Sequence, residues 1–113
     1  MPYINVKASI SLNEEKRIAL KTAFGESISV MGKSESFLMV GFEENVPLYF
    51  GGEKQETCAF VDIKVFGNVN PDQASQMTAL VCQTMEMVLG IPAEKTYVTY
   101  QGIADWGWNG KNF

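Results

Sequence analysis

The sequence predicts an α+β fold in which two β-α-β units build a four-stranded mixed sheet with two helices on one face. Two observations lead to this prediction. A stretch with the two-residue period of a strand is followed by one with the period of a helix, and this order occurs twice. The signals for helix starts and helix ends recur 59 and 58 positions apart. Because strand–helix–strand crossovers are right-handed, both helices should lie on the same side of the sheet.

The length of 113 residues indicates one domain, residues 1–113. The matching offsets predict that this domain consists of pseudo-repeat halves at about 1–57 and 58–113. The two halves share little sequence identity, so the repeat is one of pattern.

The first half begins with an alternating strand. Residues 3–10 read YINVKASI, in which apolar and polar side chains alternate. The apolar face of this strand is formed by Ile4, Val6, Ala8 and Ile10. Ser11 stands three positions before Glu14, which is the spacing of a capping box, and Ser11 is therefore predicted as the N-cap of the first helix.

The first helix is expected to run to about Met31 and to end at Gly32, because glycine is the usual residue just past a helix. A second strand is predicted over residues 36–44. A short extended piece with a glycine turn should follow over residues 47–52.

The second half repeats this plan. A strand is predicted over residues 58–67, and a helix follows with Asn70 as N-cap and Pro71 in the favoured first position. The helix should end at Gly90, and a closing strand is expected over residues 95–101. The apolar stripe of this helix is Ala74, Met77, Val81, Met85 and Val88.

Composition excludes several classes of function. The net charge is −4 and Lys and Arg form no run, so no interaction with nucleic acid or anionic lipid is expected. No stretch reaches the roughly 18 apolar residues of a membrane helix, so no membrane insertion is expected. The N-terminus lacks a basic region followed by an apolar one, and the chain is therefore expected to be cytoplasmic.

Histidine is absent, which excludes Ser-His-Asp and Cys-His catalysis and His-ligated zinc. The cysteines Cys58 and Cys82 stand 24 positions apart without a CxxC pattern, so both are interpreted as small core residues. No metal and no cofactor are predicted. If the chain is an enzyme that works near neutral pH, its proton must be carried by a group other than histidine.

Pro2 allows two interpretations. In the first it only begins a strand, which is one of the few strand positions where proline is tolerated. In the second, removal of Met1 leaves Pro2 as the N-terminus with a free secondary amine. A free α-amine has a pKa of about 8, and burial or a nearby cation lowers it further, so this amine could act as a base near neutral pH. While Met1 is attached, the Pro2 nitrogen is an amide without such basicity.

Several short motifs, in this order and spacing, resemble the macrophage migration inhibitory factor family of the tautomerase superfamily. The resemblance covers essentially the whole chain. The motifs are MPYINV at the start, MGK at 31–33, FGG at 50–52, CAFVDIKVFG at 58–67, YVTY at 97–100 and GWN at 107–109.

The resemblance implies a homotrimer of duplicated β-α-β subunits with keto–enol tautomerase activity. The implied substrates are phenylpyruvate-type aryl pyruvates, which are small aromatic 2-oxo acids, and also dopachrome-like compounds. Pro2, freed by removal of Met1, is then the catalytic base. The implied enzyme class is an intramolecular oxidoreductase (isomerase).

The resemblance also implies roles for four further residues. Lys33 matches the lysine that pairs with the substrate carboxylate, although a solvated lysine is also typical of a helix C-terminus. Phe66 matches a position that offers its backbone N–H to the substrate. Thr99 stands where the family usually has asparagine, and this departure puts the preference among aryl pyruvates in question. Tyr97 resembles a pocket tyrosine that the adjacent subunit contributes, and for both Tyr97 and Thr99 ordinary strand packing is the alternative.

Aromatic side chains are expected to line the mouth of the site. Phe37, Trp108 and Phe113 match positions where the family carries such side chains, and Tyr3 is added to them. For Trp106, ordinary packing is an equal alternative.

Other charged residues are not assigned to the site. Lys64 is interpreted as a charge that balances Asp62, and no role is assigned to Asp105 or Glu44. Arg17 is the only arginine and is expected to be exposed in the middle of the first helix. It therefore argues against the neighbouring branches that isomerise dienoic acids or hydrolyse haloacrylates, which place arginines in the pocket.

Two other functional classes stay open. Some family members are secreted signalling ligands that leave the cell without a signal peptide and bind a cell-surface receptor, and catalysis would then be vestigial. The other class is a non-catalytic module that binds a metabolite. The thiol–disulfide activity linked to a CxxC motif is not expected, because the residues from position 58 read CAFV.

Overall fold

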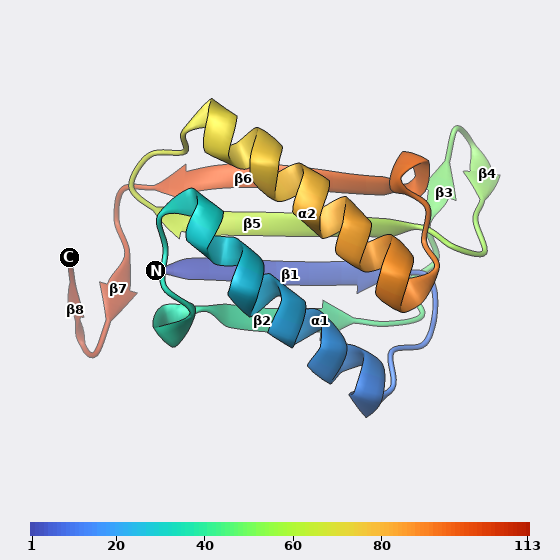
Figure 1. Ribbon diagram of the computed structural model, residues 1–113, viewed down its shortest axis with the longest axis horizontal. Helices are drawn as coiled ribbons and strands as arrows, with labels where there is room; N and C mark the ends of the chain where they lie inside the picture. Colours follow the sequence, from blue (N-terminus) through green and yellow to red (C-terminus); the bar gives the residue numbers. More distant parts are fainter.

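A computed structural model describes the whole chain, residues 1–113, and has two helices over one face of a four-stranded sheet (Figure 1). The main elements are β1 (Pro2–Ala8), α1 (Glu14–Ser27), β2 (Met39–Glu43), β5 (Ala59–Phe66), α2 (Pro71–Leu89) and β6 (Thr96–Ile103). The strands lie in the order β2-β1-β5-β6. β1 is parallel to β2 and antiparallel to β5, and β5 is parallel to β6. The predicted α+β fold with a mixed sheet is confirmed.

Two small hairpins extend from opposite ends of the sheet (Figure 1). One pairs β3 (Tyr49–Phe50) with β4 (Glu53–Lys54), and it contains the glycine turn expected in this region. The other pairs β7 (Gly107–Trp108) with β8 (Lys111–Asn112) and lies beside the N-terminus. The end of the sheet with the N-terminus therefore also holds the C-terminal aromatic residues.

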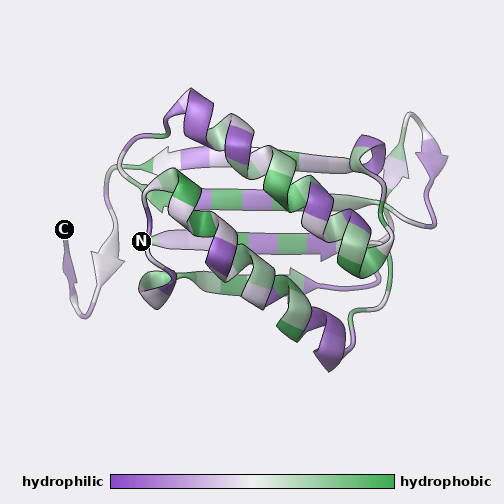
Figure 2. Ribbon diagram, in the orientation of Figure 1, coloured by the Kyte–Doolittle hydropathy of each residue, from purple (hydrophilic) through white to green (hydrophobic).

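The hydrophobic core lies between the sheet and the two helices. The predicted alternation of the strands is confirmed, and Figure 2 shows it in β1 and β5 as alternating hydrophobic and hydrophilic residues. The side chains with 0% exposure include Ile4, Val6 and Ala8 from β1, Val61 and Ile63 from β5, and Met77, Val81 and Met85 from α2. Ile10 follows the end of β1 and is partly buried against the core, as is Val88 of α2. Ala74 of the predicted stripe is half-buried.

The N-cap of α1 differs from the prediction. Asn13 caps the helix, with its side-chain oxygen accepting a hydrogen bond from the Lys16 N–H at 2.9 Å. Ser11 is not the cap, and its hydroxyl instead contacts the Asn45 side chain at 3.1 Å. Leu12 between them is fully buried in the core. The chain therefore packs one more side chain into the core before the helix begins.

The other helix ends agree with the sequence. Asn70 caps α2 by accepting hydrogen bonds from the N–H groups two and three positions later, at 2.9 and 3.1 Å. Gly90 ends α2 with a left-handed φ of 69°. After α1, a 3-10 turn over Ile28–Met31 continues to Gly32, whose φ of 70° ends the helical stretch as predicted.

The second strand is shorter than predicted. Residues 36–44 were expected to be extended, but Glu35–Phe37 form a 3-10 turn and β2 begins only at Met39. The Ser34 hydroxyl accepts a hydrogen bond from the Ser36 N–H at 3.1 Å and stabilises this turn. A similar turn over Ala93–Lys95 delays the start of the closing strand β6.

No helix covers the other face of the sheet. Most of its side chains are polar or aromatic, Met39 and Ile103 also lie on it, and Tyr97 is 58% exposed. Hydrogen bonds between neighbouring strands organise part of this face. Asn5 donates to Glu43 at 2.8 Å, and Thr99 donates to Asp62 at 3.1 Å. We refer to this surface as the uncovered face.

The two cysteines form no disulfide. Cys58 is buried as expected, whereas Cys82 of α2 is only partly buried. Burial raises the pKa of the Cys82 thiol, and the negative charge of Glu86 raises it further, so the thiol is protonated at neutral pH. Neither helix is both long and apolar enough to cross a lipid bilayer.

Candidate active site

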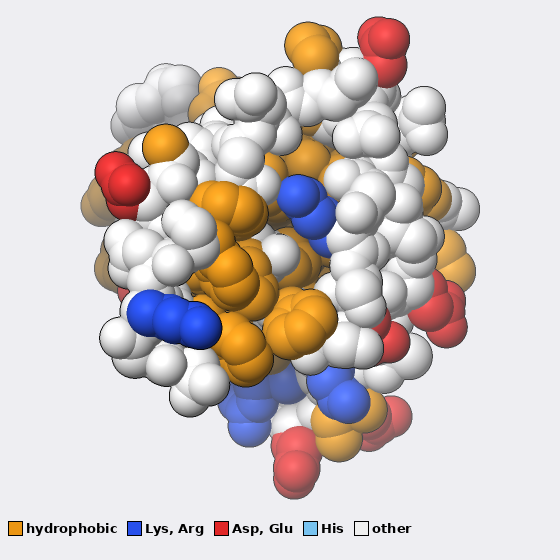
Figure 3. Space-filling model, turned by 90° about the vertical axis from the view of Figure 1, so that its left-hand side faces the viewer, with side chains coloured by type: hydrophobic (Ala, Val, Ile, Leu, Met, Phe, Trp, Pro, Cys, Tyr) orange, Lys and Arg blue, Asp and Glu red, His pale blue; other side chains and the backbone are white.

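Pro2 lies at the first position of β1, where the N-terminus meets the β7–β8 hairpin (Figure 1). It is buried, and its partner across the sheet is Val65 of β5. Pro2 lines a cavity of about 700 Å³, which we call the Pro2 cavity. Among its other lining residues are Tyr3, Phe37, Lys64, Trp106 and Trp108. Figure 3 looks onto this end of the molecule and shows hydrophobic side chains gathered near its centre, with lysine or arginine side chains beside them.

A connected group of aromatic rings forms one side of this region. Trp108 contacts Phe37 edge to face, with ring centroids 5.9 Å apart, and stacks on Phe113 at 6.2 Å. Phe113 in turn lies 5.4 Å from the Phe66 ring. Phe37, Trp108 and Phe113 are each more than half exposed, between 51% and 57%. Because such large rings are normally buried further, this exposed aromatic surface is well suited to bind a flat apolar group.

While Met1 is attached, it blocks two groups that the predicted mechanism needs, the Phe66 N–H and the Pro2 nitrogen. Its carbonyl oxygen accepts a hydrogen bond from the Phe66 N–H at 3.0 Å, and its peptide bond makes the Pro2 nitrogen an amide. Burial lowers the pKa of the terminal amine of Met1, and the positive charge of Lys33 lowers it further. The start of the chain is therefore an environment that favours a neutral, basic amine.

Lys33 is tied to the same backbone segment. It follows Gly32 at the end of the 3-10 turn, and its partly buried ammonium donates a hydrogen bond to the Phe66 carbonyl at 3.1 Å. Phe66 thus connects the other two residues. Its carbonyl accepts a hydrogen bond from the Lys33 ammonium, and its N–H donates one to the Met1 carbonyl. An ammonium has three donors, so two of the donors on Lys33 are not used by this contact.

The structure corrects the interpretation of Lys64. Lys64 and Asp62 form no salt bridge. The only salt bridge in the chain joins Arg17 to Glu44. Asp62 instead accepts the hydrogen bond from Thr99, and Lys64 lines the Pro2 cavity. Lys64 pairs with Tyr3 across the antiparallel strands, and this register could not be read from the sequence of β5 alone. The signal for Lys64 in the sequence was a polar residue at this position of β5, on the strand that pairs with the MPYINV strand.

Trp106, for which a place in the site and ordinary packing were equal alternatives, also lines the Pro2 cavity. Its carbonyl oxygen accepts a hydrogen bond from the Phe113 N–H at 3.1 Å and holds the chain end against the hairpin. Glu44, which had no assigned role, accepts a hydrogen bond from the Leu12 N–H at 3.2 Å in addition to its contact with Arg17. Glu44 therefore stabilises the entry into α1.

Tyr97 and Thr99 do not reach the Pro2 cavity within one chain. Tyr97 pairs with Phe60 near the opposite end of the sheet, and its ring lies 5.2 Å from Phe50 and 6.4 Å from Phe60. Pro2 pairs with Val65 of β5, and Val65 pairs with Gly102 of β6, which is five residues beyond Tyr97. At a rise of about 3.3 Å per residue, this places Tyr97 roughly 16 Å away along the strand.

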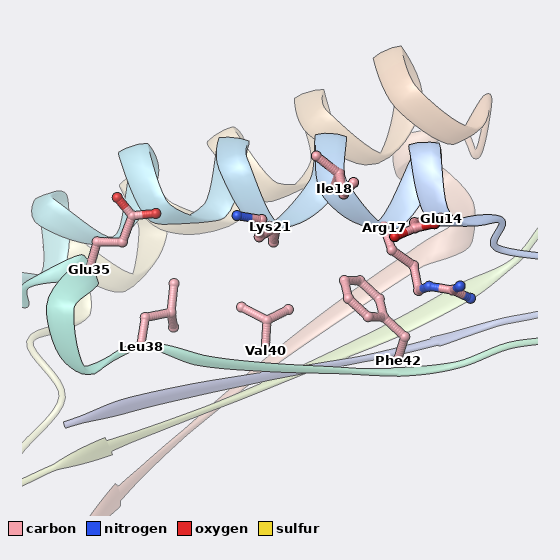
Figure 4. A pocket seen from close by; sticks show the side chains of 8 residues that line it. All are labelled: Glu14, Arg17, Ile18, Lys21, Glu35, Leu38, Val40 and Phe42. Atoms are coloured by element: carbon pink, nitrogen blue, oxygen red, sulfur yellow. The ribbon is translucent and has the colours of Figure 1, made fainter.

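A second cavity of about 500 Å³ lies between α1 and the edge strand β2 (Figure 4). Val40 and Phe42 of β2, with Leu38 just before it, face the cavity from one side, and residues of α1 face it from the other. Its charged side chains are of both signs, with Glu14 and Glu35 as well as arginine and lysine. No sequence-predicted site residue lines it, so the Pro2 cavity is the better candidate.

Comparison with models of known protein families shows which family the chain belongs to. Residues 1–113 match the family model described as macrophage migration inhibitory factor (MIF). The chain belongs to the MIF family. Membership in the family supports a tautomerase or MIF-like function.

Individual MIF relatives match along their whole length. Macrophage migration inhibitory factor from Xenopus laevis is 23% identical over 115 residues, which cover 100% of this chain and 99% of the relative. Among solved structures, Leishmania major MIF2 is 34% identical with a TM-score of 0.94, covering 100% of this chain and 97% of that one. The MIF homologue from Prochlorococcus marinus is 29% identical with a TM-score of 0.88, covering 98% of each chain. The MIF fold is therefore shared from the first residue of the chain to the last.

Proposed function

We propose that the chain is a keto–enol tautomerase of phenylpyruvate-type 2-oxo acids, with dopachrome-like compounds as further substrates. The catalytic base is the secondary amine of Pro2 after removal of Met1. One observation carries this proposal. The Met1 carbonyl accepts the hydrogen bond of the Phe66 N–H at 3.0 Å, while its peptide bond neutralises the Pro2 nitrogen. Loss of Met1 frees a base and a hydrogen-bond donor next to each other in one step.

The proposed reaction moves one proton and needs no other reactant. In the enol-to-keto direction, the Pro2 nitrogen takes the proton of the enol O–H, the carbonyl forms, and the same proton is returned to the neighbouring carbon. Such a base works best when its pKa lies close to the working pH. The position of the chain start supports this, because burial and Lys33 both lower the pKa of a terminal amine there.

Lys33 and Phe66 hold the substrate carboxylate in this proposal. The Lys33 ammonium already lies 3.1 Å from the Phe66 carbonyl, so its remaining donors and the freed Phe66 N–H lie close together. A carboxylate that accepts charge-assisted hydrogen bonds from such donors is held in a defined orientation. The aryl group of the substrate lies against Tyr3, Phe37, Trp108 and Phe113.

We further propose that the active unit is a homotrimer. Tyr97 and Thr99 lie on the uncovered face, away from the Pro2 cavity of their own chain. A neighbouring subunit that packs on this face supplies them to the site. The surface suits such packing, because Tyr97 and Met39 on it are 58% and 68% exposed.

The test measures the conversion of 4-hydroxyphenylpyruvate by protein whose intact mass shows that Met1 is absent. A rate well above that of buffer is expected. An alanine inserted between Met1 and Pro2 leaves an Ala-Pro start after processing, which makes the Pro2 nitrogen an amide again. We expect this extension to lower kcat/KM by about 100-fold or more, the usual contribution of a general base.

The control is Pro47→Ala, which changes an exposed loop proline and leaves the N-terminus intact. Its rate should equal that of the wild type. Full activity in the alanine-extended protein would refute Pro2 as the base.

A second candidate function is that of a signalling ligand. The names of the relatives, macrophage migration inhibitory factor, favour it. In this case the chain acts outside the cell on a receptor, and the alanine-extended protein would signal as well as the wild type. Loss of signalling together with catalysis would instead tie both functions to the N-terminal amine.

A further inference from the structure

We propose that Lys64 forms a second anion-binding subsite in the Pro2 cavity. The preferred substrates are then 2-oxo acids that carry another acidic group besides the carboxylate next to the keto group. This inference rests on the proposed tautomerase function and specifies its substrate class.

The position of Lys64 on β5 brings its side chain to the cavity. Val65, the next residue, points into the core with 1% exposure, so Lys64 leaves the strand on the uncovered face. There it lies opposite Tyr3 of β1, directly beside the residue pair of Pro2 and Val65. Lys64 is half-buried and lines the same cavity of about 700 Å³ as Pro2.

The charge of Lys64 has no partner within the chain. Its ammonium makes no salt bridge and no hydrogen bond to another group of the protein. The carboxylate two positions earlier, Asp62, is bound by the Thr99 hydroxyl at 3.1 Å. No aspartate or glutamate lines the cavity, and Lys64 carries the only charged side chain in its lining, beside the terminal amine of Met1. An uncompensated cation in a partly desolvated aromatic cavity favours an anionic ligand.

Lys33 cannot take both roles. Its ammonium lies on the Phe66 carbonyl at 3.1 Å, next to the start of the chain, and it does not line the cavity wall. Phe66 and Lys64 stand two positions apart on β5 with their side chains on the same side, which corresponds to about 7 Å along the strand. The two lysines are therefore anchored at separate points, Lys33 beside the Phe66 carbonyl and Lys64 in the cavity wall.

This separation selects among 2-oxo acids. A carboxylate held by Lys33 places the aryl group of the substrate in the cavity, where an acidic substituent on the ring can reach Lys64. Phenylpyruvate has no such substituent and leaves Lys64 unpaired. A phenylpyruvate with a carboxylate on its ring satisfies both cations.

The test compares kcat/KM for phenylpyruvate and 4-carboxyphenylpyruvate in the wild type, Lys64→Met, Lys64→Gln and Lys64→Arg. The wild type should prefer the dianionic substrate. Both neutral variants should lower this preference by about tenfold, the size expected for loss of one charge-assisted contact, and Lys64→Arg should keep it. The control Lys16→Met removes the same charge from α1, outside the Pro2 cavity, and should leave the preference unchanged.

The outcomes separate this inference from the proposed function. Equal preference in the wild type and in both neutral variants overturns the Lys64 subsite while the tautomerase proposal stands. If the wild type converts neither acid, the tautomerase proposal fails. The subsite is then decided by the dissociation constants of the same two acids, read from the fluorescence of Trp106 and Trp108 in the cavity wall. Weaker binding of the dianion alone in Lys64→Met supports the subsite, and equal binding of both acids to wild type and variant overturns it.

Discussion

Replacing Lys33 by methionine separates the two effects that the proposed mechanism assigns to this residue. Methionine keeps much of the length of the side chain and removes its charge. In the structure the Lys33 ammonium lies 3.1 Å from the Phe66 carbonyl and lowers the pKa of the terminal amine. The variant should therefore weaken the binding of the substrate carboxylate and also change how the rate depends on pH.

The loss of carboxylate binding sets the size of the first effect. One charge-assisted hydrogen bond is worth about 2 kcal/mol, which corresponds to about 30-fold in kcat/KM. The second effect has a defined sign. Lys33 lowers the pKa of the Met1 amine, and the same cation should disfavour the protonated Pro2 amine once Met1 is removed, so Lys33→Met should raise the pKa of the Pro2 amine. The neutral base is then present only at higher pH, and the acidic limb of the profile of kcat/KM moves to higher pH.

The shift should be partial, because burial is the larger cause of the lowered pKa and remains in the variant. The assay is the conversion of 4-hydroxyphenylpyruvate across a range of pH, with Lys33→Arg as the control that keeps the charge. We expect Lys33→Arg to keep the position of the acidic limb. An acidic limb that stays in place, or moves to lower pH, in Lys33→Met would refute the coupling between Lys33 and the N-terminal amine.

Four further substitutions test the fold and the site. Phe24→Ala empties a core position with 0% exposure and should lower the free energy of unfolding by about 3–5 kcal/mol in urea titrations, and a loss below about 1 kcal/mol would contradict its place in the core. Asn13→Ala should cost about 1 kcal/mol because Asn13 caps α1, whereas Ser11→Ala should cost less, and the reverse order would make Ser11 the cap. Tyr97→Ala should lower kcat/KM by about tenfold while sedimentation still shows a trimer, because a loss of one substrate contact has this size; an unchanged rate would remove Tyr97 from the site.

The periodic parts of the fold were predictable from the sequence because each depends on neighbouring residues only. The alternation from Ile4 to Ala8 predicts a strand with one buried face, and the three side chains on that face are fully buried. Gly32 and Gly90 end their helices because both adopt a positive φ that other residues avoid. The prediction of Ser11 as the N-cap of α1 was wrong. Ser11 and Glu14 have the spacing of a capping box, but the helix begins later because Leu12 is buried, and that burial depends on tertiary packing.

The candidate site depends on contacts between distant parts of the chain, and these could not be predicted in the same way. That Lys64 lies beside Tyr3 follows from the register of β1 against β5, and a shift by one residue would turn Lys64 to the other face. The hydrogen bond from the Phe66 N–H to the Met1 carbonyl joins residues that are 65 positions apart in the sequence. The family resemblance supplied Pro2, Lys33 and Phe66, but not this contact.

The two interpretations of Pro2 that the sequence left open are compatible. The contact between the Met1 carbonyl and the Phe66 N–H adds one hydrogen bond to the β1–β5 ladder, and losing it costs about 1 kcal/mol. The seven residue pairs from Pro2 to Ala8 remain, and their core face stays buried, so the strand does not depend on Met1. Proline has no N–H in a peptide, so the ladder never uses its nitrogen as a donor. At the first position of the strand a nitrogen can thus serve as a base while the sheet loses only this one terminal hydrogen bond.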